Sequence, residues 1–223
     1  MRCAEALALA AISAATLVLF SVFPTLDIWV SRQFLSEAGF ALNTAPALVT
    51  IRATIRLSVL AVGLFSLAML ALSLRHPAPL GTPRRVWGAI VLLYLLGPAL
   101  LVNGLLKELW GRARPADTTP FGGDATFTPP YVVTDQCATN CSFVSGEAAG
   151  ATALAISLAW MARPLPSRLR LPVATLGVTV AVLAATLRVI KGRHFLSDVI
   201  LAALFVGTLA AAIACLMRLD RRR

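Results

Sequence analysis

The chain has 223 residues, of which 58% are hydrophobic and only 13% are charged. Soluble domains are usually about 45–50% apolar, so this composition and the mean hydropathy of +0.82 exclude a soluble globular protein and indicate an integral membrane protein. The net charge of +10 does not indicate nucleic-acid binding, because no basic stripe is interleaved with exposed aromatic residues.

Long runs without a charged residue mark the predicted transmembrane helices. Each run is close to the ~20 residues that a helix needs to cross about 30 Å of hydrocarbon. Five runs contain no charge at all: residues 6–26, 57–74, 86–106, 171–187 and 199–217. A further run, residues 143–162, is apolar except for Glu147. We therefore predict an all-α, polytopic fold with six transmembrane helices, forming one membrane-embedded domain over residues 1–223.

Basic residues are distributed unequally between the two sides of the predicted bundle. With six helices, both termini and the loops after the second and fourth helices share one side, which holds eleven basic and two acidic residues. The opposite side has nine basic and eight acidic residues. The positive-inside rule makes the first side cytoplasmic. We expect a multi-pass protein of the cell inner membrane, with both termini in the cytoplasm and an active site that faces the periplasm.

Two connections on the outer side are long enough to carry function. Residues 27–52 contain Trp29, Phe34 and Phe40 spaced among polar residues, which favours an interfacial amphipathic segment over a gate for substrate. Residues 107–142 form the longest loop and contain four prolines. Loops of this length in compact domains are usually functional.

The segment KELWGRARP, residues 107–115, begins this loop and carries the first candidate site residues. Lys107 and Arg114 are seven positions apart and would share one face of a helix, two turns along. Two fixed cations at a membrane boundary favour the binding of an anion. Arg112 would lie off that face, so we leave it out of the predicted clamp.

The segment CSFVSGEAAG, residues 141–150, opens the fourth predicted helix. Ser142 or Ser145 can cap this helix, and its free backbone N–H groups favour a phosphate. Gly146 would let a ligand approach the backbone closely. Glu147 lies one turn inside an apolar span, where an acid is costly unless it is paired or protonated, so we expect it to be functional.

The segment LRVIKGRHFLSD, residues 187–198, forms a tight turn between the last two predicted helices. His194 and Asp198 are four positions apart, so a helical start to the last span brings them onto one face. A neighbouring carboxylate orients an imidazole and makes it a better nucleophile or base. The alternative is a helix-capping pair. Arg188 and the predicted clamp on the same membrane side favour a catalytic site.

Together these segments resemble the three-part signature of the type-2 phosphatidic acid phosphatase superfamily, a group of metal-independent membrane phosphatases with six transmembrane helices. The signature region covers about residues 107–198. The matching pattern is Lys107-x6-Arg114-Pro115, then Ser145-Gly146, then Arg188-x5-His194-x3-Asp198.

This resemblance implies a role for each matching residue. His194 would attack phosphorus and form a phosphohistidine, with Asp198 as its partner. No metal or other cofactor is implied. The phosphate oxygens would be bound by Lys107, Arg114, Ser145, Gly146 and Arg188.

The second part of the signature departs from the family pattern. Where most members have Pro-Ser-Gly-His, this chain has Val-Ser-Gly-Glu at residues 144–147, and Leu187 replaces the usual serine before the arginine. The histidine at the position of Glu147 would protonate the leaving oxygen. Either Glu147 is the general acid, with its pKa raised by burial, or the leaving group departs without one, or the protein only binds phosphorylated lipid.

The sequence SFVSGE after a cysteine-containing loop resembles a bacterial subgroup linked to lipid A phosphatases. We therefore expect a lipid phosphatase that acts on a phosphorylated lipid in the membrane, with lipid A first and undecaprenyl diphosphate or phosphatidylglycerophosphate as alternatives. A lipid phosphotransferase would use the same residues. A transporter is disfavoured, because the charges lie at the outer interface and not at the bilayer midplane.

The four cysteines fall into two groups. Cys137 and Cys141 lie in the outer loop, where an oxidising compartment favours a disulfide. No further Cys or His lies nearby to complete a metal site. Cys3 and Cys215 lie near the cytoplasmic ends of spans, and we expect them to be inert.

Overall fold

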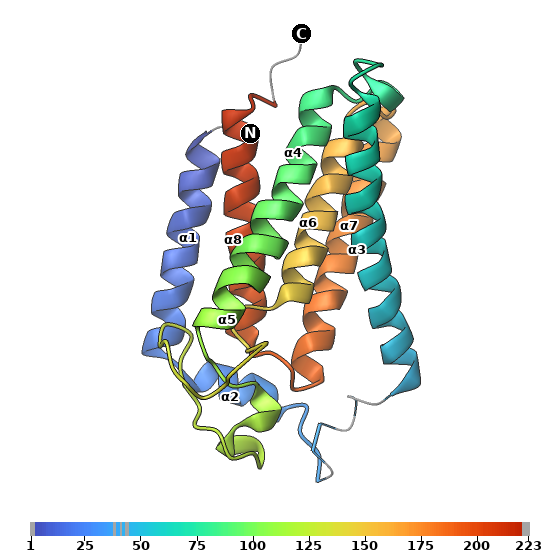
Figure 1. Cartoon of the computed structure of the whole chain (residues 1–223). Helices are drawn as coiled ribbons and strands as arrows, with labels where there is room; N and C mark the ends of the chain where they lie inside the picture. The colour runs from blue at the N-terminus through green and yellow to red at the C-terminus, as the bar shows by residue number, and fades with distance from the viewer. Residues whose placement is uncertain (1–2, 38, 41, 43–44, 220–223) are drawn as a thin grey trace.

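The computed structural model describes residues 3–37, 39–40, 42 and 45–219, and within these ranges the secondary structure is helical, without a β-strand. Figure 1 shows the helices side by side in one bundle. The long helices are α1 (Cys3–Val22), α3 (Pro46–Leu72), α4 (Arg84–Tyr94), α6 (Gly146–Met161), α7 (Ser167–Ile190) and α8 (Leu196–Leu216). The shorter ones are α2 (Thr25–Arg32), α5 (Lys107–Leu109) and three 3₁₀ turns, η2 (Pro79–Gly81), η4 (Pro115–Asp117) and η5 (Thr119–Phe121).

A π-helical segment, η3 (Leu95–Leu106), joins α4 to α5, so that residues 84–109 form one rod. Pro98 inside η3 has no N–H to donate, and π-helical stretches often accompany such interruptions at functional positions. The side-chain amide of Asn103 donates to the Pro98 carbonyl oxygen at 2.6 Å. This bond ties the side chain of Asn103 to the backbone of η3 at the proline.

Among the described residues, five helices are long and apolar enough to cross a membrane: residues 3–22, 46–72, 84–109, 167–190 and 196–216. The remaining apolar run forms α6, whose 16 residues make about 24 Å of helix at 1.5 Å per residue. The all-α prediction is confirmed, and the chain is a multi-pass membrane protein. Several helices are longer than the uncharged runs that predicted them. Their ends include charged residues such as Arg52 and Arg84, because a helix end at the membrane interface can carry charge.

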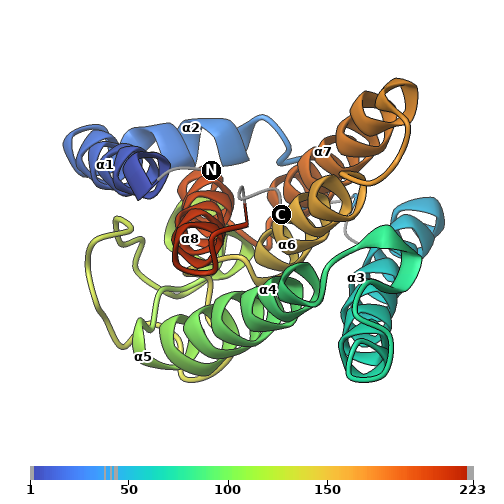
Figure 2. The same cartoon turned by 90° about the horizontal axis from the view of Figure 1, so that it is seen from above.

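The core of the bundle is α6, which contacts α3, α4, α7 and α8. Figure 2 shows it enclosed by these four helices. Its inward positions are small, with Ala149, Ala151 and Ala153 fully buried, which lets the backbones approach closely. A side chain on Gly177 of α7 would place its Cβ 2.9 Å from Ala155 Cα. Close backbone approach thus fixes α7 against α6.

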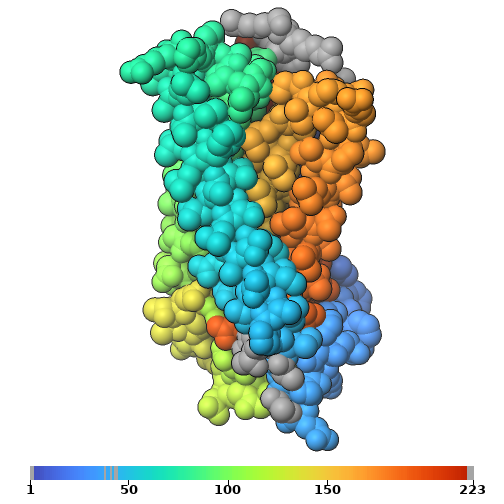
Figure 3. Space-filling model, turned by 90° about the vertical axis from the view of Figure 1, so that its right-hand side faces the viewer, coloured from blue at the N-terminus to red at the C-terminus, as the bar shows by residue number. Residues whose placement is uncertain are grey.

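The outside of the bundle is apolar, as a lipid-facing surface requires. Figure 3 shows one such face, formed by α3 and α7 with α6 visible between them. Leu57, Leu60 and Leu64 of α3 and Leu176 and Val178 of α7 are all exposed. In the bilayer these side chains contact hydrocarbon, so their exposure costs nothing.

The two ends of the bundle differ. Figure 1 shows the start of α1, the end of α8 and the connections after α3 and α6 at one end. The opposite end carries α2, α5 and the long loop that follows α5. The three segments predicted to form the active site therefore meet at the end away from both chain termini.

The interpretation of residues 27–52 as an interfacial connection is wrong in its details. Asp27 and Ser31 of α2 are fully buried, and α3 already begins at Pro46. Arg52 therefore lies within a helix. Pro46 occupies the first position of α3, where its missing N–H has no helical partner to lose.

Two disulfides are present among the described residues. One joins Cys137 to Cys141 in the long loop, with 5.7 Å between the Cα atoms. The other joins Cys3 to Cys215, with a Cα–Cα distance of 5.2 Å. The expectation that Cys3 and Cys215 are inert is wrong, because α1 packs along α8 and brings the two thiols together.

The close contact at Gly177 predicts a difference between two glycine substitutions. Gly177→Ala should lower the free energy of unfolding by about 1–3 kcal/mol, the usual cost of overpacking. Gly207→Ala in α8 is the control, because its nearest neighbour would lie 3.8 Å away, at ordinary contact distance. Thermal unfolding in detergent measures both, and equal unfolding temperatures for the two variants would contradict the prediction.

Candidate active site

A polar pocket of about 330 Å³ is lined by residues from the start of α3, the long loop, the start of α6 and the turn between α7 and α8. Six cationic side chains line it, against one carboxylate, Glu147. This excess of positive charge suits a multiply charged anion. The cationic residues are Arg52, Lys107, Arg114, Arg188, Lys191 and Arg193.

Lys107 and Arg114 do converge, but not along a helix face. The helix ends at Leu109, and the chain then turns at Gly111, where φ is +67° and a Cβ would collide with the Thr134 carbonyl. Lys107 Nζ donates to Asn140 Oδ1 at 2.8 Å, and Arg114 Nη2 donates to the Asn140 carbonyl oxygen at 2.6 Å. Asn140 therefore holds the two cations together, and the helix-face expectation is wrong.

Arg188 and Arg114 supply buried or half-buried positive charge to the pocket. Arg188 is 5% exposed, and its Nε has no hydrogen-bond acceptor among the described residues. A buried donor without a partner is costly, so it marks a place where a bound anion would add stability. Burial lowers the pKa of Arg114, and the charge of Arg193 lowers it further. Both effects favour binding of a negative ligand.

The ring of His194 lies at the edge of this pocket, in the turn between α7 and α8. Its Nδ1 lies 2.7 Å from the Ser142 carbonyl oxygen. Because a carbonyl can only accept, Nδ1 must carry the proton, and Nε2 is left with a free lone pair. Burial lowers the pKa of His194 to about 4, so the ring is neutral at physiological pH. A neutral imidazole with a free Nε2 can act as a nucleophile.

Asp198 contacts His194 less directly than the four-residue spacing predicts. His194 precedes α8, and its Nδ1 lies 3.8 Å from Asp198 Oδ2, beyond hydrogen-bond range. The Asp198 carboxylate instead accepts from Ser142 Oγ at 2.5 Å and from the Phe195 N–H at 2.9 Å. Asp198 therefore orients the Ser142 segment, whose carbonyl in turn fixes the tautomer of His194.

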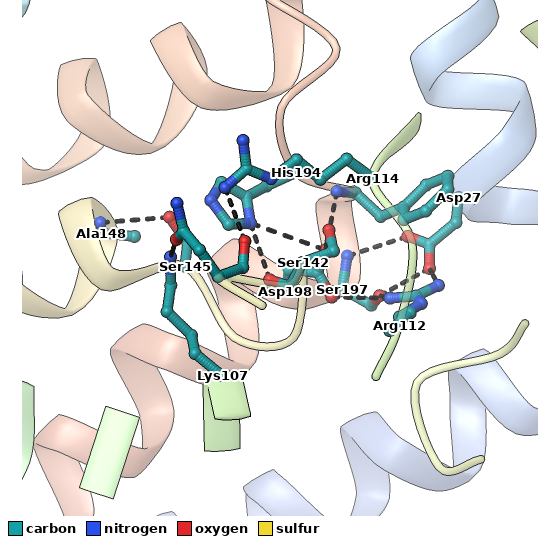
Figure 4. A network of polar contacts seen from close by, with 12 residues as sticks. Asp27, Lys107, Arg112, Arg114, Ser142, Ser145, Ala148, His194, Ser197 and Asp198 are labelled. Atoms are coloured by element: carbon teal, nitrogen blue, oxygen red, sulfur yellow. Dashed lines mark hydrogen bonds and ion pairs between the residues drawn. The ribbon is translucent and has the colours of Figure 1, made fainter. Parts of the chain in front are cut away.

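Arg112, which the sequence reasoning left out, is the centre of a buried network drawn in Figure 4. Its side chain is fully buried. Nη1 donates to Asp198 Oδ1 at 2.6 Å, and Nη2 donates to Asp27 Oδ2 at 2.9 Å. The guanidinium also lies over the ring of Phe195, 4.4 Å from its centroid, at a distance typical of a cation–π contact. Arg112 does not line the pocket, as expected for a residue outside the clamp, but the sequence reasoning missed its ion pair with Asp198.

Asp27 and Ser197 complete this network. Asp27 Oδ1 accepts from the Ser197 N–H at 2.8 Å, and Oδ2 accepts from the Ser197 hydroxyl at 2.5 Å. Burial raises the pKa of Asp27, while the charge of Arg112 opposes that shift. The only sequence signals were an isolated acid in an interfacial segment and an arginine next to a glycine, neither of which names a partner.

Ser145 and Gly146 form the start of α6. The hydroxyl of Ser145 accepts from the Ala148 N–H at 3.3 Å, so Ser145 is the helix cap and Ser142 is not. A Cβ at Gly146 would lie 2.6 Å from Asn103 Oδ1. A larger residue at this position would therefore displace the side chain of Asn103. Ser145 belongs to the group of polar side chains drawn with Lys107 and His194 in Figure 4.

Glu147 is held in an ion pair that the sequence did not indicate. Arg52 Nε donates to both of its carboxylate oxygens, at 2.9 and 3.0 Å, and Arg52 Nη2 donates to Oε1 at 2.5 Å. Arg188 Nη1 lies 3.6 Å from Oε2. Two guanidinium groups stabilise the charged carboxylate. Glu147 is therefore ionised in this structure.

A second, apolar cavity continues from the pocket along the membrane-facing side of the bundle. It has a volume of about 740 Å³ and lies between α3 and the α4–η3 rod. Arg52, Lys107, Asn140 and Glu147 line both cavities. Apolar side chains dominate the rest of its lining, among them Ile55, Val59, Leu64, Leu95 and Pro98.

Comparison with known proteins assigns the family. The family model described as PAP2 superfamily matches residues 87–223, more than half of the chain and all three parts of the signature. The chain belongs to the PAP2 superfamily. The resemblance inferred from the sequence is thereby confirmed.

Several curated relatives carry one name. A lipid A 4′-phosphatase of Rhizobium leguminosarum is 34% identical over 202 residues, which cover 84% of this chain and 85% of the relative. A lipid A 4′-phosphatase of Francisella tularensis subsp. novicida is 39% identical over 112 residues, which cover 50% of this chain and 49% of the relative. With the family assignment, these relatives make the chain a phosphatase, that is, a phosphoric monoester hydrolase.

The fold also has a solved counterpart. The crystal structure of a transmembrane PAP2-type phosphatidylglycerolphosphate phosphatase from Bacillus subtilis superposes with a TM-score of 0.63 over 98% of both chains, at 20% sequence identity. At that identity the match supports the fold alone. The fold shared with that structure includes α1 and α2, which lie outside the region matched by the family model.

The geometry of His194 predicts its protonation behaviour. The chain has two histidines, so a His76→Gln variant leaves His194 as the single ¹⁵N-labelled imidazole visible by NMR. We expect a neutral ring with the Nδ1–H tautomer from about pH 8 to about pH 5, because burial disfavours the charged form. A titration midpoint near 6.5, the ordinary value for an exposed imidazole, would contradict the burial argument.

Proposed function

We propose that this PAP2 protein is a lipid phosphatase of the cell inner membrane that releases phosphate from a phosphorylated lipid. The observation that supports a lipid substrate is the continuity of the two cavities. The cationic pocket beside His194 suits a phosphate, and the apolar cavity that shares Arg52, Lys107, Asn140 and Glu147 with it suits a hydrocarbon chain. A ligand that is charged at one end and apolar at the other fills both.

Lipid A is the substrate that we infer. The relatives named lipid A 4′-phosphatase support this choice, since the match to one of them spans most of both chains. The Ser-Gly-Glu sequence of the second signature segment, residues 145–147, supports it independently. Undecaprenyl diphosphate and phosphatidylglycerophosphate are the alternatives that a substrate panel separates.

The reaction begins with attack of His194 Nε2 on phosphorus, giving a phosphohistidine. The Ser142 carbonyl retains the Nδ1 proton at 2.7 Å, so the lone pair on Nε2 faces the substrate. The phosphate oxygens bind to the cations of the pocket, which stabilise charge in a loose phosphoryl-transfer transition state. These cations are Lys107, Arg114 and Arg188, with hydrogen bonds from Ser145 and the Gly146 amide.

In the second half of the reaction, water attacks the phosphohistidine and free phosphate leaves. If a second lipid hydroxyl took the place of water, the same site would be a phosphotransferase. A non-catalytic relative would bind the lipid without forming the phosphohistidine. Identification of the phosphate acceptor separates these alternatives.

We assign Glu147 to positioning of cations and not to proton donation. Its ion pairs with Arg52 and Arg188 stabilise the form that has no proton to give. Glu147 thereby holds Arg52 at the junction of the two cavities, and water in the pocket protonates the leaving oxygen. The alternative, a general acid, requires the Arg52 pair to open when the lipid binds.

The topology that we propose has six membrane spans, with α6 as the short fourth span. Both termini are then cytoplasmic and the pocket faces the periplasm. The positive-inside distribution of arginines supports this orientation, since the connections after α3 and α6 lie at the same end as the chain termini.

The central prediction concerns His194. His194→Gln should abolish release of inorganic phosphate from lipid A, by a factor of about 10³ or more, because no nucleophile remains. The measurement is the rate of phosphate release by purified protein in detergent, with and without excess metal chelator. We expect the chelator to leave the wild-type rate unchanged. His76→Gln is the matched control and should keep full activity. No phosphate release from any of the three candidate lipids by folded wild-type protein would rule out the proposed function.

A second prediction concerns Glu147. Glu147→Gln should change kcat by less than about tenfold, because the amide can still bind Arg52, whereas loss of a general acid typically costs about 10²–10⁴. The measurement is the pH–rate profile of both proteins with the same lipid. A loss of that larger size, with a flattened alkaline limb, would instead identify Glu147 as the acid.

A further inference from the structure

Asp27 is a buried carboxylate that the three-part signature does not contain and that lies outside the region matched by the family model, residues 87–223. It belongs to α2 and is fully buried. It contacts the start of α8 through Ser197 and the long loop through Arg112. A buried charge is expensive unless it is paired, so its presence beside the site needs a reason.

The network around Asp27 contains more negative than positive charges. Its ion pair with Arg112 and that of Asp198 with Arg112 use the same guanidinium, through Nη2 and Nη1. The Ser197 hydroxyl accepts from Arg112 and donates to Asp27, and the Ser142 hydroxyl donates to Asp198. Both hydroxyl hydrogens thus point toward a carboxylate, as ionised carboxylates require. Two negative charges face one positive charge.

This excess lies on the Nδ1 side of His194, while the cations that bind phosphate line the other side of the ring. Nδ1 contacts the Ser142 carbonyl, and Ser142 in turn contacts Asp198. The buried ring resists positive charge, because water is not available to solvate it. Phosphorylation of Nε2 must nevertheless place a positive charge there.

We propose that Asp27 is a positioning residue for His194, which acts through Arg112 and Asp198 to leave one uncompensated negative charge that stabilises the phosphorylated imidazolium. This role rests on the proposed function. Through this residue α2 would contribute to the reaction. Asp27 is the only carboxylate that α2 supplies to the described network.

The balance of the reaction shows where the charge is needed. The Nε2 lone pair forms the N–P bond, and the P–O bond to the lipid breaks with its electron pair on the lipid oxygen, which takes a proton from water. The ring keeps its Nδ1 proton and becomes positive. Water then attacks phosphorus, the N–P bond breaks, the ring becomes neutral, and the proton of that water neutralises the hydroxide of the first step.

Asp27→Asn tests the proposal, because it keeps the shape of the side chain and removes its charge. We expect kcat and the rate of phosphohistidine formation to fall about tenfold, with KM within twofold of wild type, because the phosphate-binding cations are untouched. Ser31→Ala is the matched control. Ser31 is fully buried in the same helix and its hydroxyl has no hydrogen-bond partner among the described residues, so its removal should change neither rate.

A second pair of variants keeps the test valid if Asp27→Asn does not fold. Asp27→Glu and Asp27→Gln have side chains of equal length and differ only in charge, so the proposal requires Glu to retain more phosphohistidine formation than Gln. Wild-type rates in Asp27→Asn, or equal losses in the Glu and Gln variants, would overturn it. The second result would mean that Asp27 serves packing alone.

The state of the ring provides a readout that needs no substrate. In the His76→Gln background, Asp27→Asn should lower the pKa of His194, read from the ¹⁵N chemical shifts of the ring over a full pH titration of both proteins. An unchanged pKa of His194 would count against the proposal. This readout does not depend on the formation of a phosphohistidine, whose absence from wild-type protein would instead count against the proposed function. The other charged groups around the ring stay the same in both proteins: Arg52, Lys107, Arg114, Glu147, Arg188, Lys191, Arg193 and Asp198.

Discussion

The buried ion pair between Arg112 and Asp198 is the interaction on which the geometry of the site depends. Both side chains are fully buried and their closest atoms are 2.6 Å apart. Removal of one partner from such a pair usually costs about 3–5 kcal/mol, because the other charge is left without compensation. The pair ties the loop after α5 to the start of α8, and the Ser142 segment, which orients His194, is bound to the same carboxylate. The position of the His194 ring therefore depends on contacts of Ser142 and Asp198 as well as on its own contact with the Ser142 carbonyl.

His194 separates two environments of opposite charge. On one side, cationic side chains line the pocket that we propose for the phosphate group of the substrate. On the other, two carboxylates share the guanidinium of Arg112. In the mechanism that we propose, an imidazole between them is neutral before the reaction, which keeps the Nε2 lone pair available, and the carboxylates stabilise the ring when phosphorylation makes it positive. Glu147 and Arg52 lie further out, where the polar pocket meets the apolar cavity, so their charges act on the entering ligand more than on the ring.

The sequence predicted those features of the structure that depend on a single physical constraint and on residues close together in the chain. A bilayer requires long uncharged helices, so the runs of uncharged residues predicted the helical bundle. The fixed spacings of the signature predicted that Lys107, Arg188 and His194 lie close together. Arg112 was excluded because a continuous helix was assumed beyond Leu109, whereas the chain turns at Gly111. Asp27 and Arg52 find partners 170 and 95 positions away. No periodicity in the sequence encodes contacts at such separations, and an isolated charge does not reveal its partner.

The pairing of the first helices with the last one also determines when the site can exist during biosynthesis. α1 packs along α8, and Asp27 in α2 binds the N–H of Ser197 at the start of α8. Helices emerge from the ribosome in chain order, so the earliest segments must wait in the membrane for the latest one. A nascent chain that ends before α8 contains Asp27, Arg112 and His194 but lacks Ser197 and Asp198, so the network around Arg112 cannot form. The geometry of the candidate site is therefore complete only after α8 has been synthesised.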